Sequence, residues 1–479
     1  MNRYRLPQIA SAFLLTVFGP VNLTPLAADE ASAPNLILMM GDDHGWEETG
    51  FNGHPYLKTP VLDEMAAAGL RMDRFYAAHS SCSPTRGSFV TGRHPNRYGT
   101  FAPGWSQRPE ETTIADLLGE NGYHCGHFGK WHLGPVKKAS PTSPGNMGFH
   151  DFVSHDNFFE LDPSMSRQGG PPEVIEGESS AIVIDETIRF IGEAREQEKP
   201  FLAVVWFGSP HEPYQALPDD LALYDNLPEE LQDRQVKLTS NETGLQTKRP
   251  LREVLRERYA EITAMDRAIG TLRTYLESEG LRDNTLLFYC GDNGTPRSGV
   301  LDEYSPLRGL KGQLYEGGIR VPGVIEWPAR IPEPRTTSIP AVTSDLLPTA
   351  CALAGIALPD RPLDGIGLVD LIDGTMESRP EPIGFWAFAN AGRGKKPYID
   401  AELQKGTTPL VKLSGGTPTR NFRNLHHPSI TEEDYSGERA WIDENMKLYV
   451  SKNGEVALFD VEADSAETEN LANQQPEAV

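Results

Sequence analysis

Cysteine is scarce in this sequence, and its scarcity excludes a fold held together by disulfides. Only four of the 479 residues are cysteines, at positions 82, 125, 290 and 351. Four scattered residues are not a disulfide framework. Cys290 and Cys351 lie in apolar stretches, where a buried thiol is expected. Cys82 lies instead in the polar stretch SCSPTR, and no C-x-x-C pair surrounds it. This cysteine therefore needs a chemical explanation.

Basic residues are outnumbered by acidic ones. The sequence has 44 Lys and Arg against 68 Asp and Glu, which gives a formal net charge of −24. Such a charge argues against nucleic acid as a partner, because its phosphates would be repelled. An anionic ligand would need a local basic pocket against this overall field. Acidic side chains that only keep the protein soluble are the alternative, and they require no function.

Long apolar runs are missing from all but the N-terminus. There, Arg3 and Arg5 precede IASAFLLTVFG, and small residues follow. This run is shorter than the roughly 20 residues that span a bilayer. Residues 1–28 are therefore predicted to be a cleaved export signal, and the mature protein is predicted to be periplasmic or secreted. A retained membrane anchor is the alternative. No transmembrane segment is expected after signal removal.

The remaining sequence alternates between strand-like and helix-like segments. Short apolar runs predict strands, and amphipathic stretches between them predict helices. The predicted strands are 35–40, 124–132, 201–209 and 284–290, and the predicted helices are 59–70, 113–123, 179–197 and 251–279. This alternation predicts an α/β fold with a large, mostly parallel sheet covered by helices.

The residue pattern of the sequence changes near Pro380. Asn453-Gly454 lies between two alternating segments, which is a signal for a β-hairpin. We therefore expect a large domain over residues 34–379 and a smaller α+β subdomain with an antiparallel sheet over residues 380–479. The sequence contains no internal repeats.

Three predicted strands end in polar signatures, GDDHG, GSPHEP and GDNG. Ligands of parallel sheets bind where strands end in loops, so we expect these segments to meet. Asp42, Asp43, Asp292 and Asn293 would then offer an all-oxygen ligand set. Such a set suits a hard cation, Ca²⁺ or Mg²⁺, rather than zinc. If Asp42-Asp43 or Asp292-Asn293 is considered alone, the alternative is that its residues only form a turn, since Asp and Asn are common in turns.

Four further basic side chains are candidates for a site. Lys130 and His132 in GKWHLG would point to one side of an extended segment, where they could bind an anion and transfer a proton. An exposed lysine and a packed histidine are the alternative. His211 in SPHEP could be a general acid or a loop histidine without a role. Lys311 lies among glycines, where backbone can approach a ligand closely.

Cys82 lies next to a predicted helix start at Pro84 or Thr85. Free N–H groups at this helix start would point toward Cys82 and, with Arg86, favour an anion. A thiol there is expected to have a lowered pKa and to be nucleophilic. A free surface cysteine is the alternative.

The motifs GDDHG, CSPTRGSFVTGR, GKWHLG, PHEP, GDNG and GLKGQLYEGGIRVP occur in this order. In this combination the sequence resembles the type I sulfatases, the arylsulfatase family of the alkaline-phosphatase-like superfamily. The resemblance extends from about Pro34 to the C-terminal LFDVEADSAETENLANQQPEAV. It implies an alkaline-phosphatase-like fold and a sulfuric ester hydrolase.

The resemblance also implies a modified residue. In that family the cysteine of C-x-P-x-R is oxidised after translation to formylglycine (3-oxoalanine). Cys82 would be that residue, with Pro84 and Arg86 as part of the signal for a maturation enzyme. The aldehyde hydrate would attack the sulfate sulfur and expel the alcohol. Deprotonation of its second hydroxyl would then release sulfate and restore the aldehyde.

The other candidates take roles from the same resemblance. One Ca²⁺ per subunit would be held by Asp42, Asp43, Cys82, Asp292 and Asn293. Arg86 and Lys130 would stabilise the hydrate and the charge of the transferring group. His132 would accept the proton in the elimination step. His211 and Lys311 would bind the sulfate ester, and His211 would protonate the leaving alkoxide.

Some positions depart from the commonest family pattern. Thr85, Val90 and Glu48 stand where Ser or Ala, Leu and Asp are frequent. None of the three is expected to contact the reacting group, so Cys82 is still expected to be modified.

A sulfated sugar or polysaccharide is the expected substrate. Two alternatives remain: a phosphate monoester or diester hydrolase of the same superfamily, and a non-catalytic binder of sulfated glycans if Cys82 is not converted. His426 and His427 are predicted to border the mouth of the pocket, so that replacing both raises KM for a sugar sulfate more than for an aryl sulfate. Structural packing of these two histidines is the alternative.

Overall fold

The computed structural model describes Met1 and residues 33–240, 245–297, 299, 304–414, 417–427, 429 and 431–479. The predicted export signal lies outside the described residues. Among the residues described, no helix combines the length and the apolar character needed to cross a membrane. Residues 33–479 pack as one compact unit.

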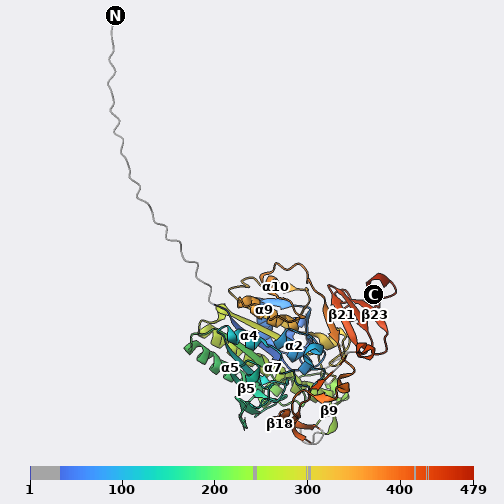
Figure 1. Cartoon of the computed structure of the whole chain (residues 1–479), viewed down its shortest axis with the longest axis horizontal. Coiled ribbons are helices and arrows are strands. Elements are labelled where there is room, and N and C mark those ends of the chain that lie inside the picture. The colour runs from blue at the N-terminus through green and yellow to red at the C-terminus, as the bar shows by residue number, and fades with distance from the viewer. Residues whose placement is uncertain are drawn as a thin grey trace. The chain divides into compact units, whose positions relative to one another are not determined.

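A ten-stranded mixed sheet organises this unit (Figure 1). Its strands, in spatial order, are β14 (Arg335–Thr337), β2 (Leu70–Met72), β13 (Gly323–Glu326), β11 (Thr285–Gly291), β1 (Asn35–Gly41), β8 (Phe201–Trp206), β4 (His124–Lys130), β5 (Asp151–His155), β6 (Ser164–Arg167) and β7 (Pro172–Val174). The five central strands are parallel to one another, in the order β11, β1, β8, β4 and β5. Antiparallel pairs join β13 to β11 and β6 to β5. The predicted mixed, mostly parallel sheet is confirmed.

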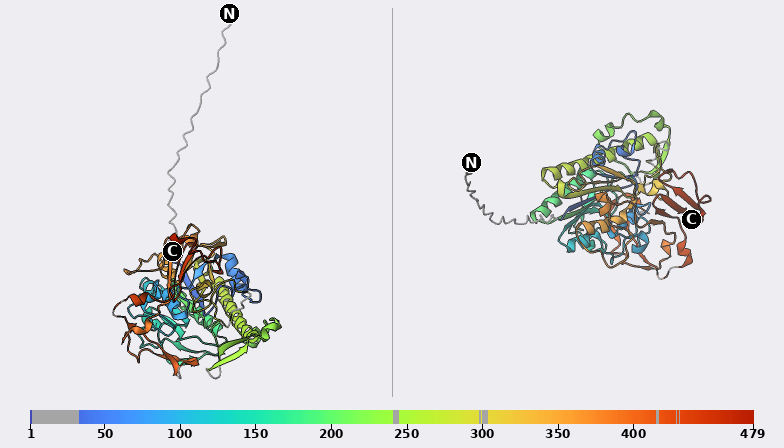
Figure 2. Two further views of the ribbon diagram at one scale, coloured as in Figure 1. Left: turned by 90° about the vertical axis from the view of Figure 1, so that its right-hand side faces the viewer. Right: turned by 90° about the horizontal axis from the view of Figure 1, so that it is seen from above.

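Helices cover both faces of the sheet (Figure 2). The covering helices are α1 (Pro60–Ala68), α2 (Cys82–Thr91), α4 (Ile114–Glu120), α5 (Ser179–Glu196), α7 (Leu251–Ser278) and α9 (Leu346–Leu353). Alternate residues of β1 divide between the layers, because successive strand side chains point to opposite faces. Leu36 and Leu38 pack with residues of α2, α4 and α9, whereas Ile37 and Met39 pack with residues of α1, α5 and α7.

The predicted helices and strands all form, with shifted ends. The amphipathic stretch after Thr59 ends at Ala68, because Leu70 already begins the short strand β2. The strand predicted over 124–132 ends at Lys130. Cys82, not Pro84 or Thr85, is the first residue of α2, and Ser81 precedes it in an extended conformation.

Smaller sheets, most of them antiparallel, complete the fold. One has four strands, β16 (Ile383–Trp386), β21 (Arg439–Asp443), β22 (Met446–Val450) and β23 (Val456–Asp460), and lies near the C-terminus (Figure 1). The predicted hairpin around Gly454 joins its last two strands. The others include the hairpins β9 (Gln235–Thr239) with β10 (Gln246–Pro250) and β18 (Lys405–Ser414) with β19 (Thr417–Asn421). A domain boundary at residue 380 stays a prediction.

Candidate active site

The polar ends of three neighbouring strands meet, as the sequence predicts. β1 and β11 are paired in register up to Gly41 and Gly291, so the residues that follow emerge side by side. The backbone N–H of Asp43 donates to Oδ1 of Asp292 at 2.8 Å. The backbone N–H of Asp42 donates to the carbonyl of Ser209, in the loop after β8, at 2.9 Å.

Cys82 reaches this point from the start of α2. Its side chain is only 2% exposed, and its Sγ lies 3.8 Å from Oδ1 of Asp43. Burial raises the pKa of the thiol to about 12, although Lys130 and Lys311 act in the opposite direction. The expected lowered pKa is therefore wrong, because loss of hydration outweighs the nearby cations. The free surface cysteine is excluded as well.

The predicted cation ligands lie together. Asp42, Asp43, Cys82 and His211 each offer one ligand atom, and these atoms all lie within 4.8 Å of one another. Asn293 lies beside them, since its Nδ2 donates to Oδ1 of Asp43 at 2.9 Å. Among the described residues, Oδ1 of Asn293 and Oδ1 of Asp42 are buried without a hydrogen-bond partner. Orphaned oxygen acceptors of this kind fit a hard cation.

Asp292 is more fully engaged by protein groups than its neighbours are. Its Oδ1 accepts from the backbone N–H of Asp43, and its Oδ2 lies 2.7 Å from a guanidinium nitrogen of Arg86. His211, which the sequence suggested as an acid, also offers a ring nitrogen to this group of possible cation ligands. The structure thus brings all predicted ligands to one place.

Each inner cation is paired with a carboxylate. Arg86 contacts Asp292, and Nζ of Lys130 lies 2.5 Å from Oδ2 of Asp42. Nζ of Lys311 lies 2.5 and 2.7 Å from the two oxygens of Asp43. The inner site therefore holds three carboxylates against three cations, and its formal charges cancel. These pairs by themselves do not produce the local basic pocket that an anionic ligand would need.

The two aspartates respond differently to this environment. Burial raises the pKa of Asp42 to about 7, although the Lys130 ammonium opposes the change. Burial alone would also raise the pKa of Asp43, but the adjacent Lys311 ammonium and His211 hold it well below its ordinary value. Asp43 is therefore the more firmly ionised of the pair.

His132 is placed by a turn and not by an extended strand. Its φ of 56° is in the left-handed region, so the expected extended i, i+2 geometry with Lys130 is wrong. It nevertheless lines the same cavity as Cys82. Burial, followed by the Lys130 charge, holds the pKa of His132 well below its ordinary value. Neither ring nitrogen has a hydrogen-bond partner among the described residues.

His211 is held by stacking and by its own backbone segment. Its ring lies parallel to that of Phe158, with the centroids 4.0 Å apart. Its Nδ1 lies 2.6 Å from the carbonyl of Glu212, which places a proton on that nitrogen. Its Nε2 is directed to Lys311 Nζ at 3.5 Å and to Asp43 Oδ2 at 3.6 Å. The ring therefore presents Nε2 to the site.

A cavity of about 430 Å³ opens over these residues, within the size range of small-molecule sites. Its lining also contains residues that the sequence did not single out, Asn157, Phe158, Lys237, Arg297 and Arg420. Arg420 comes from β19, and no local motif surrounds it. Since only the fold brings β19 to Cys82, the sequence alone carried no signal for this residue.

Arg258 of α7 is a further residue beside the site that the sequence did not single out. Its side chain is fully buried and pairs with Glu48 through two contacts of 2.6 Å. It also donates to the carbonyls of Asp43 and Pro210, each at 2.6 Å. A signal existed: position 258 lies on the buried stripe of α7, between Leu255 and Ile262. A charged residue there requires a buried partner.

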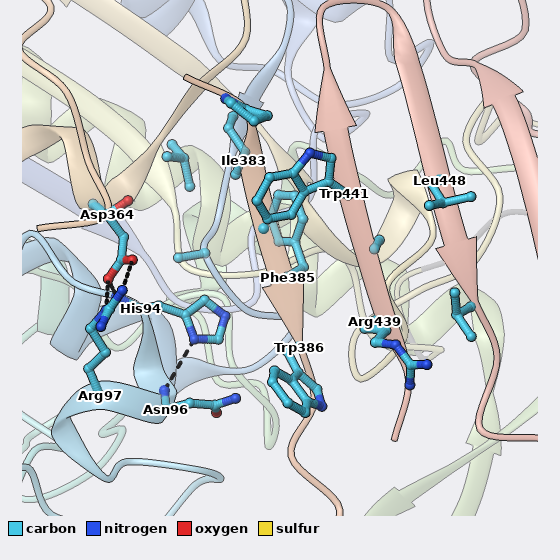
Figure 3. Close-up of a pocket in the computed structure, with 17 residues that line it drawn as sticks. His94, Asn96, Arg97, Asp364, Ile383, Phe385, Trp386, Arg439, Trp441 and Leu448 are labelled. Atoms are coloured by element: carbon cyan, nitrogen blue, oxygen red, sulfur yellow. Dashed lines mark hydrogen bonds and ion pairs between the residues drawn. The ribbon is translucent and has the colours of Figure 1, made fainter. Parts of the chain in front are cut away.

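A second cavity, of about 440 Å³, lies beside β16 (Figure 3). It contains none of the predicted site residues, and its lining includes Trp386 and Trp441. Arg97 on its wall forms a bidentate pair with Asp364. We therefore assign the chemistry to the cavity over Cys82.

His426 and His427 lie away from the cavity that Cys82 lines. The His426 ring stacks on Tyr398 with centroids 3.9 Å apart, and His427 packs edge-on against Phe101 and Phe388. Neither histidine is among the lining residues of that cavity. These contacts favour structural packing, and the predicted effect on KM stays a prediction.

Comparison with known proteins agrees with this geometry. The Sulfatase family model matches residues 34–356. Human arylsulfatase A is 33% identical over 405 residues, which cover 76% of this chain and 73% of that protein. Mouse N-acetylgalactosamine-6-sulfatase is 28% identical over 415 residues, covering 78% of this chain and 72% of the relative.

Solved structures share the fold. A protein crystallised in complex with k-i-k-neocarrahexaose superposes with a TM-score of 0.73 at 23% identity, covering 93% of this chain and 90% of that one. The family match, which spans most of the chain, and the arylsulfatase relative together decide the assignment: this chain belongs to the sulfatase family and is a sulfatase enzyme.

Proposed function

We propose that this protein is an exported enzyme that hydrolyses sulfate monoesters of a sugar or polysaccharide, with Cys82 converted to formylglycine. The observation that carries this proposal is the position of Cys82, buried at the first turn of α2 and 3.8 Å from Asp43 in a cavity lined by histidine, lysine and arginine. The name of the N-acetylgalactosamine-6-sulfatase relative supports a sulfated sugar as the substrate. The basic, apolar N-terminus supports export, and a maturation enzyme would be the partner that modifies Cys82.

The residues present fit both groups that the family implies. The hydrate of an aldehyde at position 82 would supply an oxygen nucleophile to the sulfur of the ester. Ca²⁺ would supply Lewis-acid stabilisation of a sulfate oxygen and would be held by Asp42, Asp43, Asp292 and Asn293 with residue 82.

The side chains around Cys82 divide the remaining work. Arg86 and Lys130 are fully buried and fixed by Asp292 and Asp42, so they form a preorganised positive frame for the charge that develops on the transferring group. His132, whose pKa burial holds low, is neutral at physiological pH and accepts a proton. His211 and Lys311 face the same cavity and act on the leaving alkoxide, with His211 as the proton donor.

Substrate comparison tests the reaction class. We expect kcat/KM for 4-nitrophenyl sulfate to exceed that for 4-nitrophenyl phosphate and for bis(4-nitrophenyl) phosphate by a wide margin. A phosphate ester that is preferred by a similar margin would show that the chain is a phosphate hydrolase of the same superfamily.

Modification of Cys82 is tested separately. Protein co-expressed with a maturation enzyme is expected to give a Cys82 peptide with the mass of the aldehyde. Cys82→Ala should lower kcat at least about 10³-fold, because the nucleophile is removed. Cys351→Ala, which removes another buried thiol that does not line the cavity, is the control and should retain activity. An unmodified thiol in fully active protein contradicts the proposal.

A further inference from the structure

The outer wall of the active-site cavity carries cations that the inner site does not use. Arg86, Lys130 and Lys311 are each paired with a carboxylate. Lys237 and Arg297 line the same cavity farther out, and both are exposed. Within the part of the chain that the structure describes, neither side chain forms an ion pair or a hydrogen bond. Their charges are therefore available to an anionic ligand.

A third cavity, distinct from the one beside β16, continues from this wall. It has a volume of about 480 Å³ and shares Lys237 and Arg297 with the cavity over Cys82. Arg234 also lines it, and none of the described residues of its lining is a carboxylate. In a protein with a net charge of −24, two exposed cations that no carboxylate among the described residues pairs with are a local reversal of sign. Such a reversal concentrates anions.

The hairpin β9–β10 reinforces this charge. Lys237 of β9 lies directly opposite Lys248 of β10 in the antiparallel register, and both side chains are exposed. Like charges directly opposite each other on two strands are destabilising. No acidic side chain among the described residues pairs with either lysine. An anion bound over the hairpin would relieve this repulsion.

We infer that the cavity beyond Lys237 and Arg297 is a binding site for a second anionic group of the same sugar chain. The substrate is then a glycan with at least two anionic groups: one sulfate ester lies at residue 82, and another sulfate or carboxylate lies between Lys237 and Arg297. This inference rests on the proposed sulfatase reaction for the orientation of the chain. The outer site determines substrate specificity and takes no part in the chemical step.

Competitive inhibition provides the test. Hydrolysis of 4-nitrophenyl sulfate, which is too small to reach both sites, is measured with dextran sulfate, carboxymethyl dextran and neutral dextran as inhibitors. The Lys237→Gln/Arg297→Gln variant should raise Ki for dextran sulfate about fivefold, since two exposed ion pairs are lost. Its kcat/KM for 4-nitrophenyl sulfate should change by a smaller factor than its Ki for dextran sulfate, because the small ester carries no second anionic group. A smaller or absent effect with carboxymethyl dextran would assign the site to sulfate rather than carboxylate.

A matched control separates a local site from overall charge. Lys452→Gln removes an exposed lysine from the turn between β22 and β23, outside both cavities, and should leave Ki for dextran sulfate unchanged. An unchanged Ki in the double variant, or an equal rise in the control, overturns the inference. If the wild type does not hydrolyse the aryl sulfate at all, the proposed function fails, and calorimetric titration with dextran sulfate still reports on the outer site.

Discussion

Arg258 shows how one buried side chain can join three segments of a site. It pairs with Glu48 in the loop after β1 and donates to the carbonyls of Asp43 and Pro210. Both carbonyls belong to segments that carry candidate functional side chains, Asp43 itself and His211. Arg258 is therefore a positioning residue. The Glu48 carboxylate supplies the counter-charge that offsets the cost of burying its guanidinium.

Removing the charge of Glu48 should be costly. Glu48→Gln leaves the guanidinium of Arg258 buried without a counter-charge, since the two side chains are 1% and 0% exposed. We expect a loss of about 3–5 kcal/mol in the free energy of unfolding, measured by urea denaturation. The surface pair of Arg330 and Asp373 gives a control, because its side chains are 32% and 36% exposed. Asp373→Asn should cost less than about 1 kcal/mol. Equal losses in both variants would contradict the role given to Glu48.

At the scale of helices and strands, local patterns predicted the centre of the sheet but not its margins. The buried runs of β1, β8 and β11 and the long amphipathic stripes of α5 and α7 each extend over enough residues to be recognised. Strands such as β2 have only three residues, and β2 is stabilised by pairing with β13 and β14, far away in the sequence. Pairing of this kind depends on tertiary contacts, which no local pattern encodes.

The loop between residues 53 and 57 is held by a neutral histidine. Nδ1 of His54 accepts from the backbone N–H groups of Tyr56 and Leu57, and Nε2 lies 3.1 Å from the hydroxyl of Tyr259. Burial lowers the pKa of His54 from 6.5 to about 4. The folded state therefore binds fewer protons at this residue than the unfolded state does between these two pH values.

This difference makes the loop's contribution depend on pH. The stabilisation from His54 is complete above pH 6.5 and is lost as the pH falls toward 4, by up to roughly 3 kcal/mol. In His54→Gln, which cannot titrate, the free energy of unfolding should fall less steeply between pH 6.5 and 4.5 than in the wild type. Urea denaturation across this range measures both slopes. Parallel curves for the two proteins would contradict the prediction.

At the scale of the whole molecule, strand order explains what the sequence could predict about the site. Parallel neighbours end at one edge, so the residues after β1, β8 and β11 were expected to meet, and they do. Arg420 and Lys237 line the same cavity, and they belong to the strands β19 and β9 of two small hairpins. Their placement follows from how those hairpins pack on the large sheet, which the sequence pattern does not determine.

Cation binding should couple the site to the stability of the entire fold. The proposed ligands come from the ends of β1 and β11, so an ion held by Asp43 and Asn293 would tie together the centre of the sheet. A ligand that binds only the folded state adds about 2.7 kcal/mol at a concentration one hundred times its Kd. Protein treated with a chelator is therefore expected to gain a few degrees in Tm when Ca²⁺ is restored, and less with Mg²⁺. Asn293→Ala removes an oxygen without a partner among the described residues and should reduce this gain. An equal gain in Asn293→Ala would place the ion elsewhere.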